Sequence, residues 1–173
     1  MAPRNSILFC IFLIYVSAVF SFSDYCLTES YRRDIGIKEA TGHNDGPEVE
    51  MWLKHAGVSK GNPYCSAFVK YHLDECDIPN KVTAFSPSAF NKNNVVYYKN
   101  SWKKEPKPGD VFVIYFQKLK RIGHTGFYDG LKNAKFIKTV EANTNSQNSR
   151  EGNGVYIRYR SLNTIYGISR WTE

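Results

Sequence analysis

The sequence predicts an α+β domain in which helices come first and an antiparallel sheet follows. Before residue 77, three segments carry apolar residues at helical spacing. After residue 108 the pattern changes to short apolar runs, separated by turns rich in glycine and asparagine, which is typical of strands. Helices followed by strands favour an α+β architecture with the N-terminal helices packed on the sheet.

The length and composition suit one domain with a hydrophobic core. The chain has 173 residues, of which 42% are hydrophobic and 15% aromatic, so wholesale disorder is not expected. A formal net charge of +7 fits an anionic partner such as a bacterial cell wall, but it is also consistent with solubility alone. The basic residues are scattered rather than clustered, so no nucleic-acid partner is expected.

The first residues have the features of a signal peptide. Residues 7–20 are almost wholly apolar, yet the run is too short to span a bilayer comfortably. Ser21 and Ser23 are small residues suited to a cleavage after Ser23. We expect removal of residues 1–23 and a secreted or periplasmic mature domain of residues 24–173, with no stable membrane anchor. The alternatives are an uncleaved anchor or a buried N-terminal helix.

The cysteines predict at most one disulfide in the mature chain. Cys10 leaves with the signal peptide, and Cys26, Cys65 and Cys76 remain. An odd number in an exported protein suggests one disulfide and one free thiol. A bond between Cys26 and Cys76 would leave Cys65 free. The alternatives are three reduced thiols or a bond that uses Cys65.

Three helices are predicted. The first covers residues 25–37, and the second begins after Asp45 with Pro47 in its first turn. The third is the best defined, with Asn62 as N-cap and Pro63 at the first helical position. One face of the third helix should be buried, because these residues recur at helical spacing: Cys65, Phe68, Val69, His72, Leu73 and Cys76.

The second half of the chain predicts strands. Residues 79–107 are polar and irregular, with a turn or short helix at Ser86-Pro87-Ser88. Residues 111–116 form a continuous apolar run, typical of a central strand buried on both faces. Further strands are predicted at residues 123–128, 136–143, 155–159 and 165–171.

Cys65 and His124 are candidates for nucleophilic catalysis. Cys65 falls in the first turn of the third predicted helix, where backbone N–H groups and the helix dipole favour a thiolate. His124 lies between Gly123 and Gly126, which leave room around the ring, and imidazole is well suited to proton transfer near neutral pH. Taken singly, either residue is as readily explained as a packed core residue.

A third element is Val140-Glu141-Ala142-Asn143. Strand alternation puts Glu141 and Asn143 on one face, beside His124 if the two strands are antiparallel neighbours. Either residue can orient the imidazole. The other would then polarise the substrate or hold a turn.

No metal or other cofactor is expected. His72 and Cys76 are one helical turn apart and could share a metal ion, but no second pair of ligands accompanies them. The sequence contains no phosphate-binding or dinucleotide-binding fingerprint.

Together these segments resemble the CHAP family (cysteine, histidine-dependent amidohydrolases/peptidases) in its single-domain secreted bacterial form. The resemblance runs from about residue 35 to residue 170, with weaker likeness at residues 35–39, 44–46 and 149–152. Its four main motifs, in order, are Asn62-Pro63-Tyr64-Cys65-Ser66-Ala67-Phe68-Val69, Pro108-Gly109-Asp110-Val111, Gly123-His124-Thr125-Gly126 and Glu141-Ala142-Asn143-Thr144.

The resemblance implies a papain-like fold and a monomeric peptidoglycan hydrolase that acts as an amidase or endopeptidase without a metal. By position, Cys65 is the nucleophile, His124 is the base, and Glu141 and Asn143 are supporting polar residues. Tyr64 departs from the tryptophan usual before the cysteine, so altered substrate contacts are expected there. The residues expected to contact substrate are Tyr64, Ser66, Gly123 and Thr125. The alternative is a degenerate wall-binding or inhibitory protein with the same fold.

Overall fold

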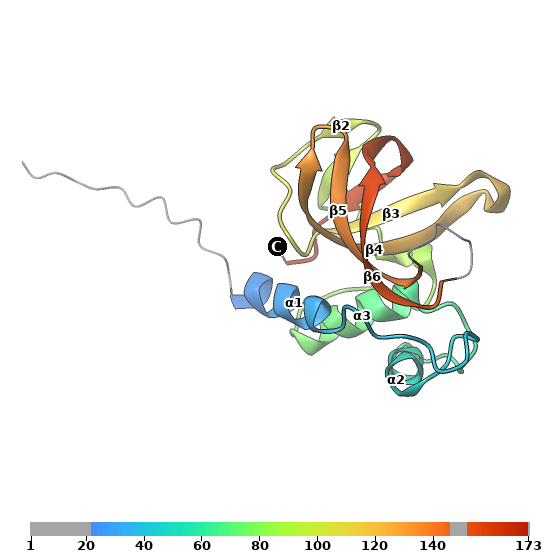
Figure 1. Cartoon of the computed structure of the whole chain (residues 1–173). Helices are drawn as coiled ribbons and strands as arrows, with labels where there is room; N and C mark the ends of the chain where they lie inside the picture. Colours follow the sequence, from blue (N-terminus) through green and yellow to red (C-terminus); the bar gives the residue numbers. More distant parts are fainter. Residues whose placement is uncertain (1–21, 146–151, 173) are drawn as a thin grey trace, which may run out of the picture.

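The computed structural model describes residues 22–145 and 152–172 (Figure 1). The signal peptide expected over residues 1–23 lies outside the described residues except for its last two positions. Ser149, Arg150 and Glu151 of a motif noted above also lie outside them. Within the described part of the chain, no helix is both long and apolar enough to cross a membrane.

Three helices precede the sheet in the chain. The third packs against the sheet and the first two pack on the third, which confirms the predicted α+β architecture (Figure 1). They are α1 (Phe22–Arg33), α2 (Pro47–His55) and α3 (Cys65–Glu75). The helix predicted over residues 25–37 therefore begins earlier and ends earlier than expected. Gly36, with a φ of 98°, lies in the turn that follows α1.

The sheet has seven strands in the order β2-β1-β7-β3-β4-β5-β6, and every pairing is antiparallel. β3 is in the middle, and its first four residues are buried, as the apolar run predicts. The strands are β1 (Val95–Tyr98), β2 (Ser101–Trp102), β3 (Val111–Phe116), β4 (Arg121–Asn133), β5 (Phe136–Thr144), β6 (Gly154–Ser161) and β7 (Gly167–Ser169).

Two strands are absent from the sequence prediction. β1 and β2 lie in the segment interpreted as irregular, although Val95-Val96-Tyr97-Tyr98 are all strand-forming residues. Lys99 and Asn100, which are left-handed, form the turn of a short hairpin between the two strands. The polar residues around the hairpin made the segment look irregular in the sequence. The short helix predicted at Ser86 is present as a 3₁₀ helix over Ser86–Ala89.

The start of α3 differs from the prediction. The helix begins at Cys65 with Tyr64 as N-cap, and the Tyr64 carbonyl accepts the first helical hydrogen bond from the N–H of Phe68 at 2.9 Å. Asn62 does not cap the helix, because its side-chain amide donates to the carbonyl oxygen of Ser59 at 3.0 Å. The shift places Cys65 at the first helical residue.

Alternation along the strands divides the core into two clusters. Along β3, Val111 and Val113 face the helices, whereas Phe112 and Ile114 face away from them. The helix-side cluster is the larger and includes Leu27, Tyr31, Trp52, Phe68, Leu73, Phe127 and Val140. The cluster on the opposite face includes Val96, Tyr128, Ile137, Ile165 and Ile168.

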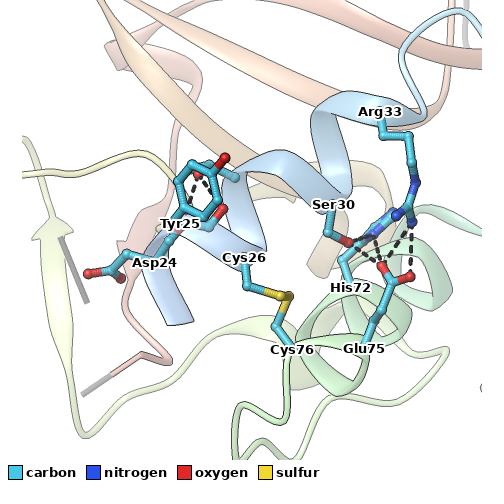
Figure 2. Close-up of a disulfide and its surroundings, with 9 residues drawn as sticks. Asp24, Tyr25, Cys26, Ser30, Arg33, His72, Glu75 and Cys76 are labelled. Carbon is cyan, nitrogen blue, oxygen red and sulfur yellow. Dashed lines mark hydrogen bonds and ion pairs between the residues drawn. A yellow bond between two sulfur atoms is a disulfide. The ribbon is translucent and has the colours of Figure 1, made fainter. Parts of the chain in front are cut away.

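A disulfide joins the first and third helices. Cys26 of α1 is bonded to Cys76, which follows the last residue of α3 (Figure 2). The bond is the first of the pairings considered from the sequence, and Cys65 is the free cysteine among the described residues. It also uses the sulfur of Cys76, so this residue does not offer a thiolate to a metal shared with His72.

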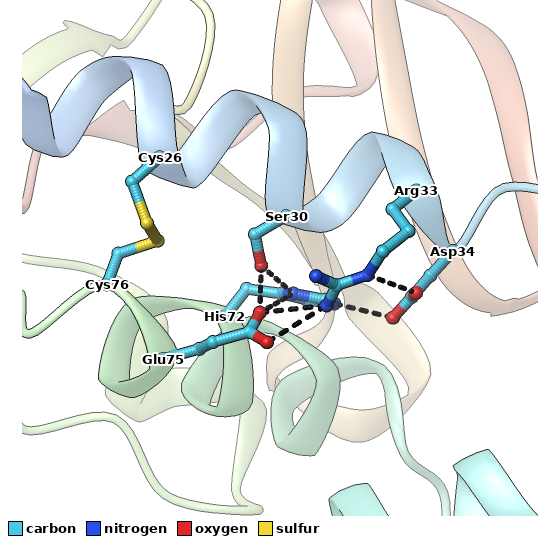
Figure 3. A network of polar contacts seen from close by, with 7 residues as sticks. All are labelled: Cys26, Ser30, Arg33, Asp34, His72, Glu75 and Cys76. Atoms are coloured by element: carbon cyan, nitrogen blue, oxygen red, sulfur yellow. Dashed lines mark hydrogen bonds and ion pairs between the residues drawn. A yellow bond between two sulfur atoms is a disulfide. The ribbon is translucent and has the colours of Figure 1, made fainter.

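A polar network lies beside the disulfide between the same helices (Figure 3). The ring of His72 is fully buried, with Nδ1 2.5 Å from the Ser30 hydroxyl and Nε2 3.2 Å from an oxygen of Asp34. Glu75 accepts hydrogen bonds from Ser30 and from the Arg33 guanidinium. The hydrogen bond at Nδ1 and the carboxylates nearby hold the ring where α1 crosses α3, which explains His72 as a structural residue.

Candidate active site

Cys65 is positioned by the start of α3. As the first helical residue it lies where the backbone N–H groups of the helix have no partner within the helix, which favours a negative charge on its sulfur. Its side chain is only 4% exposed. The sulfur lies 3.5 Å from the hydroxyl oxygen of Ser86, at the start of the 3₁₀ helix.

His124 approaches Cys65 from β4. The glycines near it leave room for neighbouring strands: Gly123 for the Phe116 ring of β3, and Gly126 for the Val140 carbonyl oxygen of β5, which would lie 2.7 Å from a Cβ there. A Cβ on Gly123 would clash with the ring of Phe116, and a Cβ on Gly126 would lie 2.9 Å from the ring of Phe112. The glycines therefore allow β3 and β4 to pack closely around the imidazole.

Glu141 holds the far side of the imidazole. Its Oε2 lies 2.8 Å from Nε2 of His124, which leaves Nδ1 as the ring nitrogen available to Cys65. The carboxylate is fully buried and accepts a hydrogen bond of 2.6 Å from the Thr139 hydroxyl. Arg160 of β6 donates two more, from Nε at 2.8 Å and from Nη2 at 2.6 Å. Of the two candidates left open by the sequence, Glu141 is the one that contacts His124.

Cys65, His124, Glu141 and Arg160 shift one another's pKa values toward their charged forms. Burial alone would raise the pKa of the Cys65 thiol, but the hydrogen bond and positive charge of His124 outweigh it and hold the pKa below its usual value. Burial would lower the pKa of His124, yet its contacts with Cys65 and Glu141 raise it to about 9. The pKa of Glu141 falls to about 2 despite burial, chiefly through Arg160 and then His124.

These shifts favour transfer of the thiol proton from Cys65 to His124, which gives a thiolate paired with an imidazolium. A thiolate is the nucleophilic form of cysteine, and the imidazolium can deliver a proton to a leaving group. The arrangement is thus capable of covalent catalysis on a carbonyl compound.

Asn143 does not contact His124. Its φ of 55° is left-handed, and the pairing of β5 with β6 is irregular between Glu141 and Thr144. This interruption breaks the alternation on which the prediction relied, so the two side chains do not share a partner. The Asn143 amide instead donates to the side-chain oxygen of Asn44 at 2.7 Å, and Asn44 donates to the carbonyl oxygen of Gly61 at 3.2 Å. Asn143 thereby holds the loop that leads into α3.

Three of the four residues expected to contact substrate have fully buried side chains. The hydroxyl of Tyr64 donates to Glu39 at 3.0 Å, that of Ser66 to the Thr83 carbonyl at 2.6 Å, and that of Thr125 to the Phe112 carbonyl at 2.8 Å. We correct the expectation for these side chains, because each is committed to an internal hydrogen bond. The fourth residue, Gly123, lines a cavity.

A cavity of about 840 Å³ adjoins the site, although neither Cys65 nor His124 is among the residues that line it. Ser86, which contacts the Cys65 sulfur, is part of its wall, as are Gly123 and Asn143. Apolar side chains form much of the remaining surface: Val58, Pro63, Phe85, Tyr115, Phe116 and Leu119. This volume is ample for a segment of a peptide or a comparable ligand.

Two further site residues, Arg160 and Ser86, were not predicted from the sequence. On β6, Arg160 lies on the face opposite to Ile157 and Tyr159. These two apolar residues are exposed, whereas the Arg160 side chain points inward. From the sequence, this alternation predicts the reverse, with Ile157 and Tyr159 buried and Arg160 in solvent, so it gives no signal that Arg160 contacts Glu141. Nothing in the sequence brings Ser86 to Cys65, because the contact depends on the tertiary fold.

A scan of protein-family models finds no match to the sequence, and a search of curated proteins finds none either. Within the described residues, no group of three or more histidine, cysteine or acidic side chains is arranged to hold a metal ion. The structural observations that bear on function are therefore the contacts among Cys65, His124 and Glu141 and the adjoining cavity.

Proposed function

We propose that the protein is a secreted, monomeric cysteine hydrolase of papain-like fold, related to the CHAP family, that cuts an amide bond in peptidoglycan. The observation that carries this proposal is a free thiol at the first residue of a helix, facing an imidazole whose other nitrogen is bonded to a buried carboxylate. Acyl transfer needs a nucleophile, a base that contacts it and a group that orients the base.

The reaction begins when the Cys65 thiolate attacks the amide carbonyl carbon and forms a carbon–sulfur bond. The N–H of Cys65, at the start of α3, is suited to stabilise the oxyanion. His124 then gives its proton to the amine nitrogen as the carbon–nitrogen bond breaks. In the second half, His124 takes a proton from water and the resulting hydroxide attacks the thioester carbon. The carbon–sulfur bond then breaks, which releases the carboxylic acid product and restores the Cys65 thiolate.

Peptidoglycan as substrate rests on the sequence resemblance, the expected signal peptide and the positive net charge of +7. Incubation of purified peptidoglycan from several wall types with the protein, followed by mass spectrometry of the soluble products, tests it. New amide-cleavage fragments that disappear with Cys65→Ala support the proposal and name the bond. Fragments that persist with Cys65→Ala would show that another group performs the cleavage.

A second candidate is a wall-binding or inhibitory protein that uses the fold without the reaction. Cys65 is only 4% exposed, and a nucleophile must be accessible to its substrate, so this low exposure favours the second candidate. Labelling with iodoacetamide separates the two candidates. Rapid alkylation of Cys65 near neutral pH fits an enzyme, whereas an unreactive thiol together with wall binding and no cleavage fits the second candidate.

A further inference from the structure

The cavity beside Ser86 borders a second one. The second cavity, of about 570 Å³, shares Tyr115 and Arg121 with the first. The two therefore meet at this pair of side chains, and each has a volume well above what a single amide group requires. We call the two cavities and the shared pair the extended groove.

The extended groove is positively charged. Its walls contain three cationic side chains, Lys92, Lys118 and Arg121, and the described residues that line it include no aspartate or glutamate. The chain as a whole has 16 acidic residues against 23 basic ones, so a long surface free of carboxylates is not simply a consequence of composition. Cations without matching anions favour a negatively charged ligand.

Arg121 is held in place at the junction. One of its terminal nitrogens donates to the Ile122 carbonyl oxygen at 2.9 Å, and the guanidinium lies 4.9 Å from the centre of the Phe85 ring. No ion pair joins Arg121 to a described residue, so its remaining N–H groups are free to meet a ligand. A guanidinium fixed in this way is well suited to bind a carboxylate through two parallel hydrogen bonds.

The second cavity offers aromatic surface beyond Arg121. Tyr115 and Tyr166 are stacked with ring centres 5.5 Å apart, and the Tyr98 and Tyr166 hydroxyls lie 3.2 Å from each other. Phe90 packs against both Tyr98 and Tyr166. Such a surface supports an extended, largely uncharged segment of a ligand, with hydroxyl groups available for hydrogen bonds.

We infer that the extended groove binds an acidic peptide, with a carboxylate of that peptide held by Arg121 while the scissile amide lies at Cys65. This inference rests on the proposed function and adds to it the chemical class of the substrate. The peptide continues past Arg121 onto the tyrosines of the second cavity. Arg121 is accordingly a specificity-determining residue rather than a part of the chemical step.

Binding to the inactive protein tests the inference without requiring cleavage. The probes are a soluble muramyl pentapeptide with free carboxyl groups and the same compound with those groups amidated, each titrated into Cys65→Ala protein by calorimetry. We expect the free acid to bind about tenfold or more tightly, because a charge-assisted bidentate contact is lost on amidation. Adding Arg121→Gln should remove the difference, and Arg121→Lys should retain part of it.

Lys135→Gln is the matched control, since it removes one positive charge from the turn between β4 and β5, outside the extended groove. It should leave both affinities unchanged. Equal affinities for the two probes, no binding of either probe, or the same effect from Arg121→Gln and Lys135→Gln would overturn the inference. Cleavage of the free-acid probe by the wild-type protein reports separately on the proposed function: carboxylate-dependent binding without cleavage would contradict the function and leave the groove assignment standing.

Discussion

Glu141 is the residue on which the charge balance of the site depends. It has no exposed surface, and its two carboxylate oxygens are shared among His124, Arg160 and Thr139. A buried carboxylate with this many donors is held in one orientation. It therefore fixes which nitrogen of His124 faces Cys65 and stabilises the protonated ring.

Glu141→Gln should lower the pKa of His124. An opposite charge in contact typically accounts for about 1 to 3 pH units of such a shift. Because the pKa of His124 is raised to about 9, the imidazolium is present below that pH and is lost as the pH rises through it. In the variant, the alkaline limit of activity should move to lower pH in a profile of kcat/KM. Glu48→Gln, at an exposed position in α2, is the control and should leave the profile unchanged.

Arg160→Gln should affect the opposite limb of the profile. Arg160 is the main group that lowers the pKa of Glu141 to about 2, so its removal lets Glu141 take up a proton at higher pH. The acid limit of Cys65 reactivity should therefore move upward in pH. Arg160→Lys keeps the charge and should restore much of the original limit. A purely structural role for Arg160 would lower the melting temperature in both variants and leave the acid limit in place.

Among the secondary-structure elements, α3 carries both the candidate nucleophile and, just past its end, one half of the disulfide. Its first residue is Cys65, and just past its end the Cys26–Cys76 bond ties it to α1. Between these points, Phe68 and His72 pack on the helix-side core. The helix is thus fixed at both ends, which keeps the nucleophile aligned with β4.

Replacing both Cys26 and Cys76 by serine should destabilise the protein. The bond closes a segment with a sequence separation of 50 residues, for which loss of the cross-link costs about 2–4 kcal/mol of unfolding free energy. Urea denaturation measures this change. Cys65→Ser, which removes no disulfide, is the control. An equal loss in the control would mean that the disulfide has no special contribution.

A second link between elements is the ion pair of Asp110 and Arg170. Asp110 precedes β3, Arg170 follows β7, and both are buried, with Nε 2.7 Å from Oδ1. Asp110→Asn removes the negative charge of this buried ion pair, which should cost about 3 kcal/mol. Thermal or urea unfolding checks this value, and Asp77→Asn at an exposed turn should cost far less.

For the whole molecule, periodicity was enough to predict the helices-then-sheet order and the central position of β3. The free Cys65 was among the pairings that the cysteine count allowed. Periodicity did not predict two local deviations from regular structure. The left-handed Asn143 interrupts strand alternation, and the N-cap of α3 is at Tyr64 rather than Asn62. Both depend on tertiary hydrogen bonds, which a single sequence does not specify.

The contacts that tune the site were also not predictable from sequence. Arg160 reaches Glu141 across the β5–β6 pair, and Ser86 reaches Cys65 over 21 positions of chain. Their pairing is set by strand register and by the path of the loop after α3. The extended groove likewise exists only because separate segments meet at Tyr115 and Arg121.

The most direct test of the account is the rate of Cys65 alkylation by iodoacetamide from pH 4 to pH 10, in the wild-type protein and in His124→Ala. We expect the wild-type thiol to react at pH values below its usual pKa, because His124 stabilises the thiolate. In His124→Ala, reactivity should appear only near or above the pKa of an ordinary thiol, about 8.5. Identical curves for the two proteins would contradict the claim that Cys65 and His124 act as a catalytic pair.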